Sequence, residues 1–155
     1  MGLRATRFGQ RIGRASRICI DTAPIVYHLE NVEPWSELTT LALDRVSEGT
    51  VECIVSAVSV TELLVRPYQL ENLEAIEFCE RFLLSMPNLR IVPVDYELAR
   101  RAASIRARHR LRTPDSIIMA TAIGEAADLL LTNDPDFEKA ESSETRVLLM
   151  SRFLR

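Results

Sequence analysis

Four acidic residues interrupt or border apolar segments of this sequence: Asp21, Glu62, Asp115 and Asp134. Asp21 and Asp134 each follow a short apolar run, Asp115 opens one, and Glu62 lies within one. Desolvating a carboxylate costs several kcal/mol unless its pKa shifts or it finds a partner. Carboxylate oxygens are also the ligands that hard divalent cations prefer. The four positions therefore suggest a shared site for a divalent cation.

The segments that must position these acids alternate between strand and helix. We expect strands at residues 17–20, 51–55, 89–94, 127–132 and 146–150. We expect helices at residues 22–30, 34–47, 56–65, 69–85 and 96–110, and one that begins at Thr113-Pro114-Asp115, with Thr113 as its cap. The third helix is expected to stop at Arg66-Pro67. Strands that are continuously apolar and separated by helices predict an α/β fold: a three-layer α/β/α sandwich around a mainly parallel sheet of four to five strands.

The predicted topology brings the acids together. In open α/β sheets, ligands bind beyond the carboxyl ends of the strands. Asp21 and Asp134 lie at such ends, whereas Glu62 and Asp115 lie on helices that can flank the same crevice. We therefore expect the four side chains to converge.

Each acid also has a purely structural interpretation. Asp21 can cap a helix, Asp115 can be a first-turn helix acid, and Asp134 can be a turn residue. Glu62 can pair with Arg66 four residues later. Glu62 is the acid least easily explained in this way, because its neighbours in the sequence are apolar and few faces of its helix would be wet.

Composition limits the class of protein. The chain has 155 residues, 47% of them hydrophobic, which fits one globular domain. No apolar stretch reaches the roughly 20 residues that span a bilayer, and no apolar segment follows the basic start of the chain as a secretory signal requires, so we expect a cytoplasmic protein. Cys19, Cys53 and Cys79 are far apart in apolar segments, which favours buried, reduced thiols over a zinc site.

Positive charge is concentrated in two segments. Residues 1–17 and 97–112 each sum to +5, whereas the remainder carries −13. This asymmetry is compatible with a polyanion bound beside an acidic cleft. In the second segment we consider Arg106, Arg108, Arg110 and Arg112 as candidate contacts to an RNA backbone, with a solvated helix surface as the alternative.

Four stretches, in this order, resemble the motifs of PIN domains, particularly the toxins of VapBC-type toxin–antitoxin systems. They are Ile20–Tyr27, Ser59–Pro67, Leu111–Ala122 and Leu131–Asp134, and the resemblance extends from about Arg17 to Leu149.

The resemblance implies a compact α/β/α nuclease, usually dimeric, that binds Mg²⁺ or Mn²⁺ and cleaves RNA. Asp21, Glu62, Asp115 and Asp134 take the family's acidic positions as catalytic residues and metal ligands, and Thr132 and Asn133 match the polar residues that support the last acid. Asp136 either assists or caps a turn. A VapB-like antitoxin is the implied partner, and the implied reaction is metal-assisted phosphodiester hydrolysis.

Such domains commonly begin almost at the first strand, so residues 1–16 depart from the pattern. We expect this basic extension to be disordered, with residues 17–155 forming a single PIN-like nuclease domain. An RNA-binding addition and a wrongly chosen start codon are the other interpretations of residues 1–16.

Two other functions stay open: a housekeeping RNA-processing nuclease, and a catalytically silent binding module of a repressor complex. Other catalytic classes lack their motifs. The sequence has no Gly-x-Ser-x-Gly turn of a serine hydrolase and no glycine-rich phosphate loop.

Overall fold

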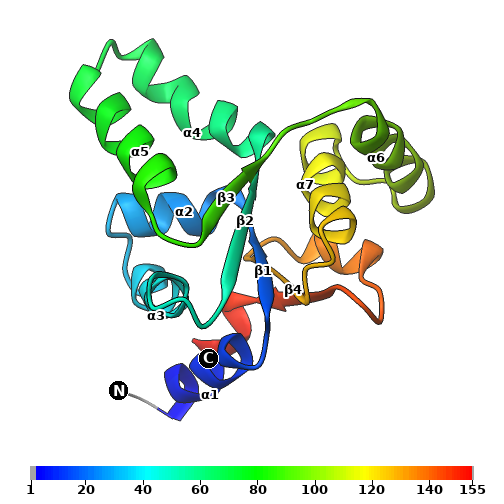
Figure 1. The fold of residues 1–155 in the computed structure, drawn as a ribbon, viewed down its shortest axis with the longest axis horizontal. Coiled ribbons are helices and arrows are strands. Elements are labelled where there is room, and N and C mark those ends of the chain that lie inside the picture. Colours follow the sequence, from blue (N-terminus) through cyan, green and yellow to red (C-terminus); the bar gives the residue numbers. More distant parts are fainter. Residues whose placement is uncertain (1–2, 155) are drawn as a thin grey trace.

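The computed structural model describes residues 3–154 and is built around a single parallel sheet. Its five strands lie in the order β3-β2-β1-β4-β5, and each neighbouring pair is parallel (Figure 1). The strands are β1 (Arg17–Ile20), β2 (Glu52–Ser56), β3 (Leu89–Val92), β4 (Leu129–Thr132) and β5 (Arg146–Leu149). The predicted parallel sheet is therefore confirmed.

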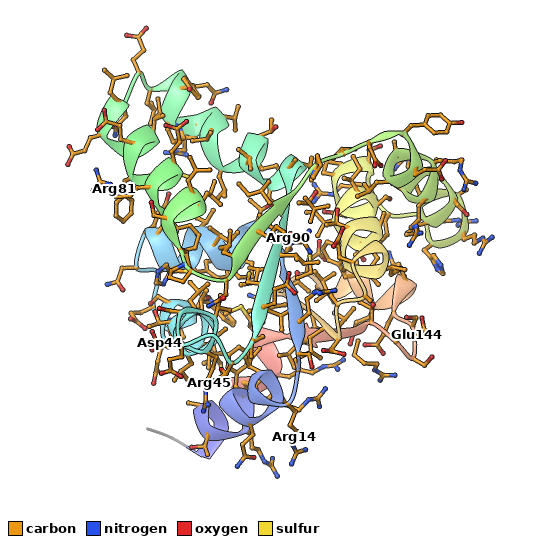
Figure 2. All side chains as sticks on the ribbon, viewed as in Figure 1. Arg14, Asp44, Arg45, Arg81, Arg90 and Glu144 are labelled. Atoms are coloured by element: carbon orange, nitrogen blue, oxygen red, sulfur yellow. The ribbon has the colours of Figure 1, made fainter. Side chains whose placement is uncertain are left out.

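Helices cover both faces of the sheet, with α2 and α3 on one side and α6 and α7 on the other (Figure 1). The helices are α1 (Leu3–Gly13), α2 (Thr22–Leu29), α3 (Trp35–Ser47), α4 (Ala57–Gln69), α5 (Leu73–Ser85), α6 (Tyr96–His109) and α7 (Thr113–Gly124), with short 3₁₀ helices η1 (Pro135–Ala140) and η2 (Met150–Phe153). Strand residues alternate between two cores: Ile18 and Ile20 pack in the cluster with α1 to α5, whereas Cys19 packs with α6, α7 and η1. Figure 2 shows side chains filling the space on both sides of the sheet. The three-layer prediction is confirmed.

Several predicted helix ends differ from the structure. The helix predicted to start at residue 69 begins at Leu73, because Gln69 ends α4 and the Asn72 side chain caps α5 by accepting a hydrogen bond from the Ala75 amide. Helix α4 continues through Pro67 to Gln69, because a proline in the last turn leaves later bonds intact: the amides of Leu70 and Asn72 still bond to the carbonyls of Arg66 and Pro67. Helix α7 begins at Thr113, so its N-cap is Arg112 and not Thr113 as predicted. The Arg112 side chain makes no capping hydrogen bond. Asp115 lies in the first turn as expected.

The expectation of a disordered N-terminal extension is wrong for the described residues. Residues 3–13 form α1, and Phe8 and Ile12, one turn apart on this helix, are completely buried in the first core. The ring of Phe8 packs edge-on against Phe153, with 5.3 Å between centroids. The basic composition concealed an amphipathic helix, whose apolar face supplies the burial that holds it to the domain. Residues 1 and 2 lie outside the described residues.

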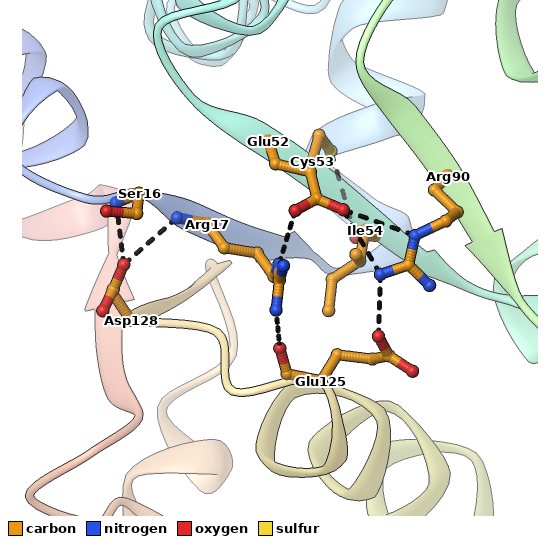
Figure 3. Close-up of polar contacts among 8 residues, drawn as sticks. All are labelled: Ser16, Arg17, Glu52, Cys53, Ile54, Arg90, Glu125 and Asp128. Atoms are coloured by element: carbon orange, nitrogen blue, oxygen red, sulfur yellow. Dashed lines mark hydrogen bonds and ion pairs between the residues drawn. The ribbon is translucent and has the colours of Figure 1, made fainter.

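Ion pairs join the amino ends of the neighbouring strands β1, β2 and β3 (Figure 3). Glu52 on β2 accepts a hydrogen bond from Arg17 Nε of β1 at 2.7 Å and another from Arg90 Nη2 of β3 at 3.2 Å. Arg90 also pairs with Glu125 at 2.7 Å, and Arg17 donates to the Glu125 carbonyl. The Arg17 hydrogen bond is the main cause that lowers the pKa of Glu52. This network lies at the sheet edge opposite the acids of interest, where we assign it to stability.

We expect Glu52→Gln to lower the free energy of unfolding at pH 7 by about 1 kcal/mol, because the pairs are partly exposed and screened. A lowered carboxyl pKa stabilises the fold above the ordinary pKa, and this stabilisation is lost as pH falls, so the difference from wild type should be smaller at pH 3 than at pH 7. Urea denaturation at both pH values measures it. Glu97→Gln is the control, because its pair with Arg100 is about 70% exposed at both side chains (68% and 71%). Equal effects of the two changes would contradict the assignment.

Cys19, Cys53 and Cys79 are free thiols, and all three are buried as predicted. Within residues 3–154, no helix combines the length and apolar character needed to cross a membrane.

Candidate active site

The site lies between β1 and β4, where the order of the strands in the sheet reverses. Strand β1 is central and pairs with β2 on one side and β4 on the other. The connections from β1 and from β4 leave the carboxyl edge beside each other, which creates the crevice where α/β sheets bind ligands. Asp21 follows β1 directly, and its amide bonds to the carbonyl of Leu131 in β4 at 3.0 Å. Asp134 comes two residues after β4.

A cleft of about 380 Å³ at this edge brings all four predicted acids together. It is lined by Asp21, Thr22, Ala23, Val26, Tyr27, Glu62, Arg112, Asp115 and Asp134. The residues come from the start of α2, the middle of α4, the start of α7 and the loop after β4. The predicted convergence of the acids is therefore observed.

Asp21 is the most constrained acid. It is 7% exposed, and its two carboxylate oxygens accept hydrogen bonds from the Thr22 amide and the Thr132 hydroxyl, both at 2.7 Å. The pKa of Asp21 is raised to about 6, mainly by burial and to a smaller extent by the charges of Asp115 and Glu62, against the lowering effect of these two bonds. A carboxylate in this state gains from any cation that enters the cleft.

Thr132 connects Asp21 to the last acid. Its hydroxyl donates to Asp21 and accepts the backbone amide of Asp134 at 3.0 Å. The Asp134 side chain accepts the amide of Asp136 at 2.9 Å and so caps η1. Thr132 therefore holds Asp21 in place and orders the turn that carries Asp134.

Asn133 has contacts other than those expected. Its side-chain amide bonds to the Tyr27 hydroxyl at 3.4 Å, and its carbonyl oxygen accepts the Ser151 amide at 3.1 Å. Asn133 thus connects the loop to α2 and to η2, and neither of these two hydrogen bonds involves an acid of the cleft. Asp136 pairs with Lys139 at 2.8 Å on the surface.

Glu62 lies at the mouth of the cleft and is exposed, so the expectation that few faces of its helix are wet is wrong. Helix α4 presents an open face, on which Val65 and Tyr68 are also exposed. Glu62 accepts a hydrogen bond from the Thr22 hydroxyl at 2.8 Å, and this hydroxyl also bonds to Ser59 at 2.9 Å. Thr22 therefore positions Glu62 next to Asp21.

Asp115 is 6% exposed and pairs with Arg112 at the start of the same helix. Arg112 Nε lies 2.9 Å from Asp115 Oδ2, and Nη2 lies 3.4 Å from Oδ1. The hydrogen bond with Asp115 is the main cause that raises the pKa of Arg112, and the charges of Asp134 and Glu62 add to it. The Arg112 guanidinium thus offsets part of the negative charge of the cleft.

The donor set fits a hard divalent cation in its chemistry, since four carboxylates from different elements face one cleft. With the side chains as they stand, no three His, Cys, Asp or Glu residues of the described chain form a group that holds a metal ion. Each acid has a protein partner instead, and for Asp115 that partner is a cation. The four carboxylates therefore suit a divalent cation in their chemistry, but their side chains must rotate before three or more of them can coordinate one ion.

The model of the PIN domain matches residues 18–142. The chain belongs to the PIN domain family. Among curated proteins, no sequence matches it.

Solved structures share the fold of this PIN domain. VapBC2 of Rickettsia felis, bound to a fragment of its promoter DNA, matches with a TM-score of 0.66 and 18% identity, covering 84% of this chain and 98% of that one. FitAcB of Neisseria gonorrhoeae gives 0.63 and 25% over 84% and 96%. VapC20 of Mycobacterium tuberculosis, described as a sarcin–ricin loop cleaving toxin, gives 0.65 and 17% over 83% and 98%.

The arginines considered as RNA contacts differ in their surroundings in this PIN domain. Arg106 donates to the Leu111 carbonyl at 2.6 Å and so closes the turn between α6 and α7. Arg112 is in the cleft. Arg108 and Arg110 are exposed, and Arg110 has a positive φ of 57° as the cap of α6.

Sequence reasoning missed two polar cleft residues of the PIN domain, Thr22 and Tyr27, and considered Arg112 only as an RNA contact and not as the ion-pair partner of Asp115. Thr22 was recognisable as a polar residue next to Asp21. Tyr27 lies on α2, where its ring stacks on Trp35 with centroids 5.8 Å apart, a contact without a local sequence signal.

Proposed function

We propose that this PIN domain is a metal-dependent endoribonuclease that hydrolyses RNA phosphodiester bonds, and that it is the toxin of a VapBC-type pair. The observation that carries the proposal is the single cleft lined by Asp21, Glu62, Asp115 and Asp134 at the topological switch point. Toxin–antitoxin complexes among the structures that share the fold support the toxin assignment.

In this proposal the four carboxylates hold Mg²⁺ or Mn²⁺. The ion would lower the pKa of a bound water and offset the charge that develops on the phosphate. Asp21, fixed by Thr132 and the Thr22 amide, and Asp115, at the start of α7, are assigned as direct ligands. Glu62 and Asp134 complete the acidic set.

Arginine side chains serve the substrate. Arg112 lines the cleft, and its side chain is about 75% exposed. Once a cation neutralises the acids, the Arg112 guanidinium can leave Asp115 and bind a phosphate of the substrate. Arg108 and Arg110 extend this positive surface, whereas Arg106 is committed to the Leu111 carbonyl.

Partners follow from the same proposal. A VapB-like antitoxin binds the domain, and two copies of the chain form a homodimer in the cytoplasm. Exposed apolar side chains on α4 and α5 support a protein interface there. They are Val65, Tyr68, Leu73, Phe78 and Leu84.

Removing divalent metal tests the activity. The purified protein is expected to cut RNA with Mg²⁺ or Mn²⁺ and to lose at least about 100-fold of the rate in EDTA, because the crowded carboxylates then repel the phosphate and activate no water. Restoring Mn²⁺ should restore cleavage. Cleavage that continues at the same rate in EDTA, in protein shown to be metal-free, would contradict a metal-dependent mechanism.

Expression in cells separates toxin from housekeeping enzyme. Induction of the wild type should arrest growth and create discrete new RNA 5′ ends, and co-expression of the antitoxin should prevent both. Discrete cleavage without growth arrest would favour an RNA-processing nuclease, and arrest without new 5′ ends would favour a binding module.

A further inference from the structure

Helix α1 carries a row of arginines that the proposed active site does not use. Arg7 and Arg11 are exposed and four residues apart, so they share one face of the helix, and the exposed Arg14 lies in the turn directly after Gly13, the last residue of α1. Helix α1 contains no acidic residue. It also precedes the segment that matches the PIN domain model, which begins at residue 18. We call Arg7, Arg11 and Arg14 the α1 basic face.

The charges of this face are not neutralised by the rest of the described chain. No residue between 3 and 154 forms an ion pair with any of its three arginines, whereas Arg17, Arg90, Arg100, Arg112, Arg146 and Arg152 all have carboxylate partners. Arg45 of α3 approaches the end of the helix: its Nη1 would lie 3.9 Å from a Cβ at Gly13. Figure 2 shows Arg14 and Arg45 on the same end of the molecule, with Asp44 beside Arg45 at the margin.

The α1 basic face and the acidic cleft lie at opposite edges of the sheet. Helix α1 ends four residues before β1 begins, at the amino edge, whereas Asp21 follows the carboxyl end of β1. A strand of four residues separates the two edges by about 13 Å. Helix α1 lies at the bottom of Figure 1, near the C-terminus, away from the junction of α2, α4 and α7. One ligand that touches both regions must be long.

We propose that the α1 basic face binds the phosphate backbone of RNA outside the cleft and forms a second contact for long substrates. The inference rests on the proposed ribonuclease function. The chain as a whole carries a net charge of −3, so a polyanion is attracted to a local row of unpaired arginines and not to the protein surface in general. Arginines spaced in this way contact phosphates without reading the bases. The contact increases the affinity for long RNA and leaves the chemistry at the acids unchanged.

An anionic membrane is the other polyanion that a basic amphipathic helix binds, and packing argues against it. A helix that lies in a membrane interface buries its apolar face in lipid. In α1 that face is already buried in the domain, since Phe8 and Ile12 have no exposed surface. The arginines are thus the accessible part of the helix, which suits phosphates in solution.

Binding measurements in EDTA test the proposal without depending on cleavage. Fluorescence anisotropy with a long, unstructured RNA compares the wild type with R7A/R11A/R14A. Three lost phosphate contacts should reduce the slope of log K against log salt by about 2 and weaken binding at least about 10-fold at low salt. A short oligonucleotide that fills only the cleft should bind both proteins equally. Alanine favours helix, so α1 should stay folded, which circular dichroism and thermal unfolding check.

Two matched variants make the result specific. R7K/R11K/R14K keeps the charges and should retain most of the affinity. R81A/R100A/R146A removes the same charge from exposed positions on α5, α6 and β5, and should change the salt slope much less. An equal loss in both alanine variants, or an unchanged slope in R7A/R11A/R14A, would overturn the proposal. So would arginine-dependent binding to phosphatidylglycerol vesicles with unchanged RNA affinity. If the protein binds RNA through this face but cleaves none, only the proposed ribonuclease function fails.

Discussion

Asp115→Asn is expected to lower the rate of RNA cleavage at least about 100-fold and to weaken Mn²⁺ binding at least about 10-fold. Asparagine keeps the size of the side chain but removes one charge from the acidic cleft. It also leaves Arg112, which lies 2.9 Å from Asp115 in the structure, without its carboxylate. An unpaired guanidinium then opposes the entry of a cation. Electron paramagnetic resonance of Mn²⁺ measures the binding, and cleavage of a labelled RNA measures the rate.

The same substitution should leave the fold intact. The Arg112 side chain is about 75% exposed, so losing the ion pair and the helix-dipole contact should lower the stability of the fold only slightly. Asp136→Asn is a matched control, because Asp136 is an exposed acid near Asp134 that pairs with Lys139. It should retain cleavage and Mn²⁺ binding. Full activity in Asp115→Asn, or equal losses in both variants, would show that the cleft is not the catalytic site.

The sequence predicted the sheet and the position of the site because both depend on local patterns that the fold respects. Continuous apolar strands separated by helices allow few arrangements other than a covered parallel sheet. The acids after β1 and β4 are then brought to one edge by topology alone. Asp21 and Asp134 met at the switch point for this reason.

Other features depended on contacts between distant residues. The extension before β1 is rich in arginine, yet Phe8 and Ile12 are enough to seat α1 on the core, a contact that includes Phe153 at the other end of the chain. Glu62 looked enclosed because its sequence neighbours are apolar, but α4 leaves a face open and the side chain is exposed. Apolar neighbours in sequence predict burial only where another element covers that face.

The details of the cleft were equally non-local. The bond from Thr132 to Asp21 joins residues 111 positions apart, and the bond from Asn133 to Tyr27 joins residues 106 apart. No spacing rule specifies such pairs. Arg112 and Asp115 are only three residues apart, so their ion pair is local. The sequence does not show whether this ion pair is lower in free energy than a state in which Arg112 is solvated or one in which Asp115 binds a metal ion.

The burial of Asp21 leads to a prediction about stability and pH. In the fold the pKa of Asp21 is about 6, above its ordinary value of 3.8. Between these two values the folded protein binds a proton that the unfolded chain releases, so the free energy of unfolding falls as pH rises. The full effect is about 3 kcal/mol, complete by pH 7. Asp21→Asn does not titrate and should lack this decline.

Urea denaturation in EDTA at pH 4 and pH 7 measures the effect as a difference between the two proteins. Relative to the wild type, Asp21→Asn should gain about 2 kcal/mol over this range, because the unfolded Asp21 is already partly ionised at pH 4, and contributions of other groups such as Glu52 cancel in the comparison. Asp136→Asn should instead follow the wild type. Millimolar Mn²⁺ at pH 7 should restore stability to the wild type, because an ion that binds only the folded state stabilises it, and should restore much less to Asp21→Asn. Parallel pH curves for wild type and Asp21→Asn would mean that the pKa of Asp21 is not raised in the folded protein. A cation would then gain nothing from neutralising an unfavourable buried charge at Asp21.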